Sequence, residues 1–368
     1  MKNNNKLIIF MPSMDGGGVE KNIIIIANFL SKIVKKIYLV TYDKKFNKFF
    51  DKKIEIINIK KKNDVNTSKY KKYFFCLVKL LNIFHKESNV SVFTFQANIY
   101  AIILCKIFGV KIVSRSNSSP EGWNKNFLKN LIFSIFFKLS NRIIVNSYTF
   151  KKQIDNKFNI NSKMIYNPLN KKEIIDKSKF RCSEKIFLDK KTFKIICVAR
   201  FTDQKDHNTL LKAFKIVSSK INARLILVGF GNKESEIKKF INSHKLGKKV
   251  KIIKYTLNPY KYIAKSNILV LSSLYEGLPN VILEALTLKR YVISSDCPTG
   301  PKEILKNGKY GSLFKMKDYL KLSEIILDYY YHPSKYKKKI TDGFKSLNRF
   351  DFNINCKKYF FEIKKIMN

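Results

Sequence analysis

The most constraining feature of this chain is an alternation of short apolar runs with longer segments of helical periodicity along its first half. The runs predict strands over residues 6–12, 37–42, 54–59, 90–95, 110–114, 142–146 and 164–166, and the intervening segments predict helices over 19–33, 69–85, 99–108, 124–139 and 149–158. Strands and helices that alternate at this spacing form βαβ units. The first half is therefore expected to be an α/β domain with a doubly wound parallel sheet.

The alternation stops at a polar, lysine-rich stretch and then restarts. Further strands are expected over 193–198, 224–228, 250–254, 268–272 and 291–295, with helices over 207–219, 233–243, 258–264, 279–288 and 302–306. The predicted organisation is a Rossmann-like domain over 1–170, a linker over 171–191 and a second Rossmann-like domain over 192–349. Ligands of such sheets bind beyond the carboxyl ends of the strands, so a cleft between the two halves is the expected active site.

The distribution of cysteine, histidine and apolar residues excludes several other kinds of protein. The six cysteines and four histidines are scattered without a CxxC pair, which indicates neither a disulfide framework nor a metal site. No apolar stretch approaches the roughly 18 residues of a spanning helix, and no signal segment is visible. The chain is therefore expected to be cytoplasmic.

The net charge of +46 suggests an anionic partner. Only seven of the 73 basic residues are arginine, whereas base readout relies on bidentate arginine, so no specific nucleic acid partner is expected. Two interpretations stay open: solvated lysine faces that reflect an AT-rich coding bias, and attraction to an anionic membrane surface.

The densest motif is Ser272–Ala285, which follows an apolar strand, leads into a helix and contains Glu276 and Glu284. Amides at the helix start, from Asn280 to Ile282, can bind a phosphate. Glu284 can then accept hydrogen bonds from a ribose diol. The simpler interpretation is a strand, loop and helix with incidental surface glutamates. The binding candidates around this helix start are Gly277, Leu278, Pro279, Asn280 and Val281.

Two other strand ends in the second half carry residues suited to a diphosphate. Arg200 and Lys205 follow the strand 193–198 and supply positive charge. Gly229 and Gly231 follow the strand 224–228 and allow a backbone to approach a ligand closely.

Together with Gly16–Lys21, these motifs make the chain resemble the retaining glycosyltransferases of family 4, which have two Rossmann-like domains in the GT-B arrangement. The resemblance implies that Arg200 and Lys205 hold the donor diphosphate, that Glu284 holds the ribose and that Glu276 contacts the transferred sugar. It implies that Gly17 and Gly18 approach the phosphate from the first domain. The second half offers no Asp-x-Asp pair to deliver a metal, and Arg200 with Lys205 already supplies positive charge, so neither a metal nor a cofactor is expected. The segment 350–368 is similar to a terminal helix that returns to the first domain, and an ordinary C-terminal amphipathic helix is the alternative.

The acceptor side departs from many family members, because no histidine base can be assigned there. The candidates are Gln96 and Asn98 after the strand 90–95, and Arg115 and Asn117 after the strand 110–114, with Glu121 in the same loop as the latter two. A structural role stays open for each. Trp123 is expected to anchor the following helix rather than to stack on a sugar.

The predicted function is retaining transfer of a hexose or N-acetylhexosamine from a nucleotide sugar, with UDP as the expected nucleotide. The expected acceptor is a lipid-linked or membrane-anchored glycan in surface polysaccharide or lipopolysaccharide synthesis. Apolar residues on helix 69–85 (Leu77, Leu80, Leu81, Phe84) and segment 124–139 (Phe127, Leu131, Ile135, Phe136, Leu139) are expected to lie on the inner face of the cell membrane, or else to face the core. A GT-B epimerase or phosphorylase and a basic nucleic-acid-binding protein are the alternatives.

Overall fold

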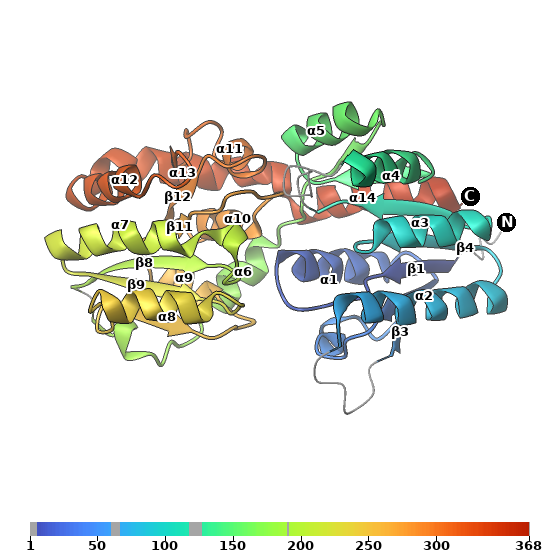
Figure 1. Ribbon diagram of the computed structural model, residues 1–368, viewed down its shortest axis with the longest axis horizontal. Coiled ribbons are helices and arrows are strands. Elements are labelled where there is room, and N and C mark those ends of the chain that lie inside the picture. Colours follow the sequence, from blue (N-terminus) through green and yellow to red (C-terminus); the bar gives the residue numbers. More distant parts are fainter. Residues whose placement is uncertain (1–5, 60–66, 118–126, 190, 368) are drawn as a thin grey trace. The chain divides into compact units, whose positions relative to one another are not determined.

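The computed structural model describes residues 6–59, 67–117, 127–189 and 191–367. They form two compact units (Figure 1). The first unit contains the chain up to Pro168 together with the C-terminal residues from Phe352, and the second contains Leu169–Asp351. The helix α14 (Phe352–Met367) therefore belongs to the first unit, where it packs against α1, β4 and β5.

The first unit is built on a seven-stranded parallel sheet in the order β3-β2-β1-β4-β5-β6-β7. Its strands are β1 (Lys6–Phe10), β2 (Lys36–Thr41), β3 (Ile54–Asn58), β4 (Val90–Thr94), β5 (Lys111–Arg115), β6 (Arg142–Val145) and β7 (Lys163–Met164). Its other helices are α1 (Gly18–Leu30), α2 (Lys69–Lys86), α3 (Asn98–Ile107), α4 (Phe127–Lys138) and α5 (Tyr148–Phe158). The chain leaves β1 toward β2 on one side and returns to β4 on the other, so the β1/β4 pair is the topological switch point of this sheet.

The second unit repeats this plan with a six-stranded parallel sheet in the order β10-β9-β8-β11-β12-β13. Its strands are β8 (Phe193–Val198), β9 (Ala223–Val228), β10 (Val250–Ile253), β11 (Ile268–Leu271), β12 (Tyr291–Ser295) and β13 (Ser312–Phe314). Its helices are α6 (Lys171–Ser178), α7 (His207–Lys220), α8 (Glu234–Ser243), α9 (Tyr260–Ala264), α10 (Asn280–Thr287), α11 (Pro301–Ile304), α12 (Tyr319–Tyr331) and α13 (Lys337–Lys345). The switch point here is the β8/β11 pair.

The central strands β1 and β8 carry nearly continuous apolar runs because both faces of a doubly wound sheet are covered. Leu7–Phe10 and Ile195–Cys197 are almost fully buried, and each lies in the middle of its sheet. The predicted Rossmann-like α/β architecture is confirmed in both units.

The expected linker over 171–191 differs from what the structure shows. Residues 171–178 form α6, which packs against α9 and α10 inside the second unit. Asn170 caps this helix by accepting a hydrogen bond from the Glu173 amide, at 3.2 Å. The lysine-rich composition reflects the exposed face of a helix rather than an unstructured connection.

Candidate functional site

In the second unit, two of the predicted donor-side residues, Lys205 and Glu276, meet at the switch point of the sheet. Lys205 ends a 3₁₀ turn (Asp203–Lys205) that follows β8, and Glu276 lies in the loop that follows β11. The Lys205 Nζ lies 2.5 Å from the Glu276 Oε1. Both side chains are largely buried, with 15% and 7% exposed. Two residues separated by 71 positions in sequence thus form one charged pair at the carboxyl edge of the sheet.

The Glu276 carboxylate is fixed by a second donor. The Ser273 hydroxyl donates to the same oxygen, Oε1, at 2.6 Å. Ser295 at the end of β12 donates in turn to the Ser273 carbonyl, also at 2.6 Å. Because these hydroxyls come from neighbouring strand ends, the carboxylate is held on a rigid part of the fold.

The backbone of the Glu276 loop is supported by the segment after β12. The Thr299 hydroxyl donates to the Glu276 carbonyl, and the Glu276 amide donates to the Pro298 carbonyl at 3.4 Å. Gly300 has a φ of +66°, and a Cβ there would lie 2.1 Å from the Gly277 carbonyl oxygen. A glycine is therefore required at 300 both by the backbone conformation and by the close approach of the two loops. The sequence reading missed these supporting residues, although Gly300 before Pro301 was a visible signal for a turn at a helix start.

The loop that carries Lys205 is held from the β11 side as well. The Ser272 hydroxyl donates to the carbonyls of Lys205 and Asp206, at 3.0 and 2.8 Å. Asp206 caps α7 by accepting from the Thr209 amide at 3.2 Å. The position of Lys205 is therefore set by both strands of the switch point.

The remaining donor-side residues take different places. Arg200 follows β8 and is exposed, whereas Glu284 lies in the middle of α10 and is buried. Asn280 and Val281 begin α10 and are partly exposed, and Gly277, Leu278 and Pro279 before them are buried. The amide of Ile282 donates to the Pro279 carbonyl at 3.1 Å, so this group does not contribute to the expected phosphate site.

Gly229 and Gly231 have a structural explanation that the sequence reading did not foresee. A Cβ at 229 would lie 2.0 Å from the Ala199 carbonyl oxygen, and a Cβ at 231 would lie 2.2 Å from the Phe201 carbonyl oxygen. The two glycines let the loop after β9 pack on the loop after β8, which carries Arg200. Their contact with a ligand stays a prediction.

A buried group of weakly polar side chains lies behind the charged pair. The Cys197 Sγ lies 3.9 Å from the His207 Nε2, and Phe201 packs edge-on against the His207 ring. Burial, assisted by the charge of Lys205, lowers the pKa of His207 from 6.5 to about 4. Burial raises the pKa of the Cys197 and Cys297 thiols to about 12. These groups are therefore neutral near pH 7 and serve as packing.

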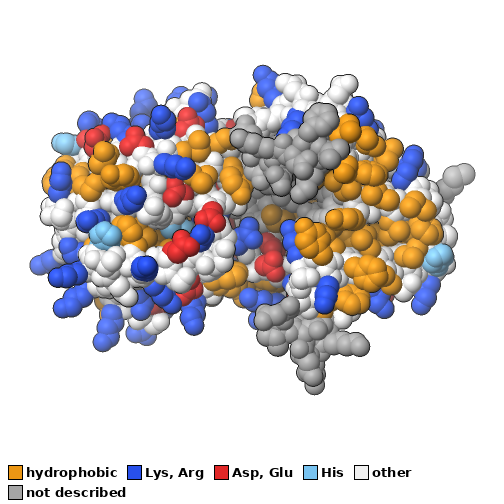
Figure 2. All heavy atoms as spheres, in the orientation of Figure 1, with side chains coloured by type: hydrophobic (Ala, Val, Ile, Leu, Met, Phe, Trp, Pro, Cys, Tyr) orange, Lys and Arg blue, Asp and Glu red, His pale blue; other side chains and the backbone are white. Residues whose placement is uncertain are grey.

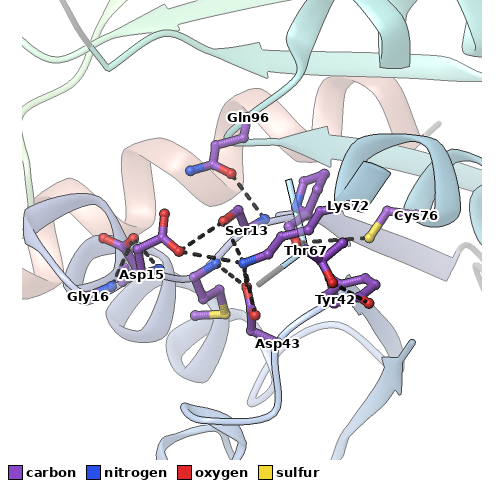
Figure 3. Close-up of polar contacts among 12 residues, drawn as sticks. Ser13, Asp15, Gly16, Tyr42, Asp43, Thr67, Lys72, Cys76 and Gln96 are labelled. Carbon is purple, nitrogen blue, oxygen red and sulfur yellow. Dashed lines mark hydrogen bonds and ion pairs between the residues drawn. The ribbon is translucent and has the colours of Figure 1, made fainter. Parts of the chain in front are cut away.

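In the first unit, a polar cluster surrounds the turn from Ser13 to Gly18 after β1 (Figure 3). The Ser13 amide donates to the Gln96 Oε1 at 3.1 Å, across the β1/β4 switch point. The Met14 amide donates to the Asp43 Oδ2 at 2.9 Å. The Lys72 ammonium on α2 lies 3.0 Å from both Asp43 oxygens. Asp43 and Lys72 carry no sequence motif, so only the fold reveals that they meet at this turn.

Glu20 on α1 completes this cluster. Its Oε1 accepts from the amides of Asp15 and Gly16, at 3.2 and 3.3 Å. A Cβ at Gly17 would lie 3.2 Å from the other carboxylate oxygen. The expected approach of Gly17 and Gly18 to a donor phosphate stays a prediction.

The acceptor-side candidates have structural roles that correct the expectation for Arg115. Its side chain is fully buried, and it donates to the Tyr359 hydroxyl at 2.9 Å, to the Asn167 Oδ1 at 2.6 Å and to Asn117. Asn117 donates to the Phe95 carbonyl at 2.7 Å, and Asn98 donates to the Arg115 carbonyl at 3.0 Å. Arg115 therefore joins the β5 end to α14 and does not present its donors to a ligand. Glu121 and Trp123 lie outside the described residues.

Comparison with known proteins identifies the chain. Residues 178–345 match the family model of glycosyl transferases group 1. An uncharacterized glycosyltransferase of Methanocaldococcus jannaschii is 31% identical over 77% of this chain and 79% of that protein. The chain belongs to the group 1 glycosyltransferases. A Campylobacter jejuni relative of this family, named as an N-acetylgalactosaminyltransferase acting on a diphospho-undecaprenol-linked sugar, is 24% identical over 84% of the chain and 86% of that protein.

Solved structures place this glycosyltransferase in the GT-B fold. A Rickettsia africae glycosyltransferase superposes with a TM-score of 0.80 and 20% identity over 100% of this chain and 99% of its own. Anabaena HepE in complex with UDP-glucose superposes with a TM-score of 0.80 and 17% identity over 98% and 99%. At these identities the likeness concerns the fold alone.

In the described part of this glycosyltransferase, no group of three or more His, Cys, Asp or Glu side chains is arranged to hold a metal ion. Within the same residues, no helix is long and apolar enough to cross a membrane.

Proposed function

We propose that this glycosyltransferase moves a hexose or N-acetylhexosamine from a UDP-sugar to a lipid-linked glycan, with retention of the anomeric configuration and without a metal. The observation that carries the proposal is the Lys205–Glu276 pair, 2.5 Å apart at the switch point of the second sheet. A buried ammonium at the carboxyl edge of a parallel sheet suits the diphosphate of a nucleotide sugar.

The proposed reaction is a front-side displacement. The bond between the anomeric carbon and the phosphate oxygen breaks, and the acceptor oxygen bonds to the carbon on the same face. The acceptor proton passes to the leaving phosphate, so the products are the glycoside and UDP. Lys205, with Arg200 beside it in sequence, would balance the growing phosphate charge. The two side-chain hydrogen bonds of Glu276 use Oε1, and its Oε2 would accept from a hydroxyl of the transferred sugar.

The choice of donor is supported by a structural neighbour, and the choice of acceptor by two relatives. Anabaena HepE has been solved with UDP-glucose, and the Campylobacter jejuni relative acts on an undecaprenol-linked glycan. A second Campylobacter relative, 24% identical over 95% of this chain, is also named for an undecaprenol-linked acceptor. These names favour a UDP donor and a lipid-linked acceptor for this chain, in the synthesis of a surface polysaccharide.

A lipid-linked acceptor agrees with the surface of the first unit. Exposed apolar side chains gather over α2 and α3 (Figure 2), and Tyr73–Tyr100 and Phe84–Phe108 ring contacts join the two helices. The exposed residues are Tyr70, Phe74, Phe75 and Val78 on α2, Tyr100, Ile107 and Phe108 at α3, and Leu131, Ile132, Ile135 and Leu139 at α4. We call this set the apolar face. Exposed lysines on α2 flank it, so an anionic bilayer surface is the partner that it fits.

The residues expected from the sequence to face the membrane on α2 require a correction. Leu80 is fully buried, and Leu77 and Phe84 pack against the core of the first unit. Leu77, Leu81 and Phe84 are only partly buried, and the Phe84 ring contacts Phe108 of the apolar face, so this stripe lies between the core and the apolar face. On the segment 124–139, Leu131, Ile135 and Leu139 are exposed, whereas the side chain of Phe127 is not described.

Donor identity is tested by thermal shift with UDP-, GDP- and TDP-sugars, because a ligand that binds only the folded state raises the melting temperature. A shift with UDP-sugars alone is expected, and a shift with GDP-sugars alone would refute the proposed donor. The stereochemistry is read by NMR of the product, where an inverted anomeric centre contradicts retention. Loss of activity in EDTA with recovery in manganese contradicts the metal-independent reaction.

Membrane association is tested by flotation with vesicles of neutral and of anionic lipid. Wild-type protein is expected to float with anionic vesicles, and Phe74→Ser with Val78→Ser is expected to weaken this binding. Leu320→Ser is the matched control, because Leu320 is an apolar residue of the second unit with 55% of its surface exposed. Equal, negligible binding of the wild type to both vesicle types would exclude the membrane surface as a partner.

A further inference from the structure

The turn Ser13–Gly18 is held by side chains from other elements. Four consecutive amides, from Ser13 to Gly16, each donate to a side-chain oxygen: one to Gln96, one to Asp43 and two to Glu20. These acceptors follow β4, follow β2 and lie on α1. Glu20 holds the amides of Asp15 and Gly16 locally, from the first turn of α1, whereas the amides of Ser13 and Met14 are fixed by tertiary contacts with Gln96 and Asp43.

Lys72 is the cation that allows acidic residues to gather at this turn. Its ammonium lies 3.0 Å from both Asp43 oxygens, 3.6 Å from the Asp15 Oδ1 and 3.4 Å from the Ser13 Oγ (Figure 3). Only 13% of each side chain of the Lys72–Asp43 pair is exposed. Loss of the ammonium would leave the Asp43 carboxylate, which holds the Met14 amide, without its positive partner.

Stability alone is a poor explanation for such a pair. Removing two charges from water costs several kcal/mol, and apolar side chains of similar volume are often equally stabilising or better. What a charged pair adds is a defined direction for each hydrogen bond, and here that direction fixes the amide of the turn.

The Lys72–Asp43 pair lies close to the position where a ligand of the first sheet is expected. The turn follows β1 at the switch point of the first sheet, where ligands of open parallel sheets bind. In the second unit the same topological position carries the Lys205–Glu276 pair. Each sheet therefore has a largely buried pair of a lysine and a carboxylate beside its switch point. The Lys205–Glu276 pair is proposed to meet the donor, and the Lys72–Asp43 pair holds a turn.

We propose that the Lys72–Asp43 pair positions the Ser13–Gly18 turn for sugar transfer. The inference rests on the proposed function and on the expectation that Gly17 and Gly18 of this turn approach the donor phosphate. Lys72 is a positioning residue: it acts through Asp43 and the Met14 amide and contacts no reacting atom. A displacement of about 1 Å in such a turn is sufficient to lower turnover roughly a hundredfold.

The chain offers a matched control at the other end of α2. Glu87, which follows α2, forms an ion pair with Lys6 at the start of β1. Lys72 lies in the first turn of α2 and contacts the loop that follows β1. Lys72 thus ties the start of α2 to the loops that follow β1 and β2, whereas the Lys6–Glu87 pair ties the end of α2 to the start of β1. Of these two lysines, only Lys72 reaches the turn.

The experiment compares Lys72→Met, Lys72→Arg, Asp43→Asn and Lys6→Met. Transfer kinetics give kcat and KM, and hydrogen exchange with mass spectrometry follows the peptide over residues 13–18. Lys72→Met and Asp43→Asn are expected to lower kcat about 10- to 100-fold and to speed exchange in the turn. Donor binding, measured by calorimetry with UDP, is expected to change less than about threefold, because the second unit holds the nucleotide. Lys72→Arg should recover most of the turnover, since it retains the charge.

Lys6→Met is expected to leave both the turnover and the exchange of the turn close to wild type. Folded Lys72→Met with wild-type kcat would overturn the positioning role. An equal loss of kcat in Lys6→Met would also overturn it, because a general loosening of α2 would then explain the effect. Failure of the proposed function is distinguishable: wild-type protein would then show no transfer from a UDP-sugar, whereas the exchange experiment still reports whether Lys72 holds the turn.

Discussion

Removal of the Lys205 ammonium should change both the melting temperature of the protein and its turnover number, and the two effects can be measured separately. Lys205→Met retains the length of the side chain and leaves Glu276 with the Ser273 hydrogen bond but without its positive partner. Breaking a buried pair by removing one partner costs about 3 to 5 kcal/mol. Because 15% of the Lys205 side chain is exposed, the lower value of about 3 kcal/mol applies. For a unit of this size we expect a fall in melting temperature of roughly 6 to 12 °C.

Turnover should fall by a mechanism independent of this destabilisation. If Lys205 balances the charge that develops on the leaving phosphate, its loss should lower kcat about 100- to 1,000-fold, as for one preorganised charge-stabilising group. The double variant Lys205→Met/Glu276→Gln removes both buried charges. It should recover most of the melting temperature and none of the turnover.

The assay is steady-state kinetics with saturating acceptor at a temperature well below the melting point of each variant, with circular dichroism to confirm folding. Folded Lys205→Met with near-native kcat would refute the assignment of the phosphate charge to this residue. Recovery of turnover in the double variant would show that Lys205 acts only by neutralising Glu276, and the same assignment would fail.

Three further predictions concern other parts of the second unit. Glu284→Ala should mainly raise the donor KM, because a ribose contact does not change during the reaction, and an equal fall in kcat without a change in KM would contradict this role. Gly300→Ala should lower the free energy of unfolding by more than about 1 kcal/mol, because the φ of this residue is +66° and its Cβ would meet the Gly277 carbonyl. Gly247→Ala is the control, because a Cβ there meets no atom within 4 Å. His207 binds a proton more weakly in the folded chain than in the unfolded chain. Its contribution to the free energy of unfolding should therefore be fully present above pH 6.5 and be lost as the pH drops toward 4, with a loss of roughly 2 kcal/mol at pH 5. Urea unfolding at pH 7 and pH 5 measures this loss, which His207→Gln should abolish.

The architecture could be predicted from the sequence because parallel strands buried on both faces carry nearly continuous apolar runs. The strands β8 and β11 were identified from such runs, and with them the positions of Lys205 and Glu276 at strand ends. Their contact could not be predicted, because the adjacency of β8 and β11 is a property of the sheet order. The short strand β13 and the helices α12 and α13 were missed. With three residues, β13 has too little pattern to be recognised.

The first-unit site was harder to predict because polar residues in loops serve both fold and function. Arg115 has the side chain expected of an anion ligand, but its position on β5 buries it against Tyr359 of the C-terminal helix. Asp43 and Lys72 lie in unremarkable sequence and become neighbours only through the packing of α2 on the sheet. A charged residue gives no sign in the sequence of whether its partner will be water, a ligand or another side chain.

The helix α2 shows why helical periodicity alone could not identify the surface that meets a partner. Tyr73, Cys76, Leu80 and Ile83 are buried at helical spacing, and Tyr70, Phe74 and Val78 form a second stripe at spacing of four. Either stripe satisfies the rule for an amphipathic helix, so the sequence indicates two possible inner faces. In the structure, the first stripe packs on the sheet, in the core around Val40 and Val92. The exposed apolar side chains of the second stripe therefore do not contribute to the core of this unit. Because exposed tyrosine and phenylalanine beside lysine are unfavourable in water and favourable at a lipid surface, this exposure is itself the reason to test membrane binding on this face.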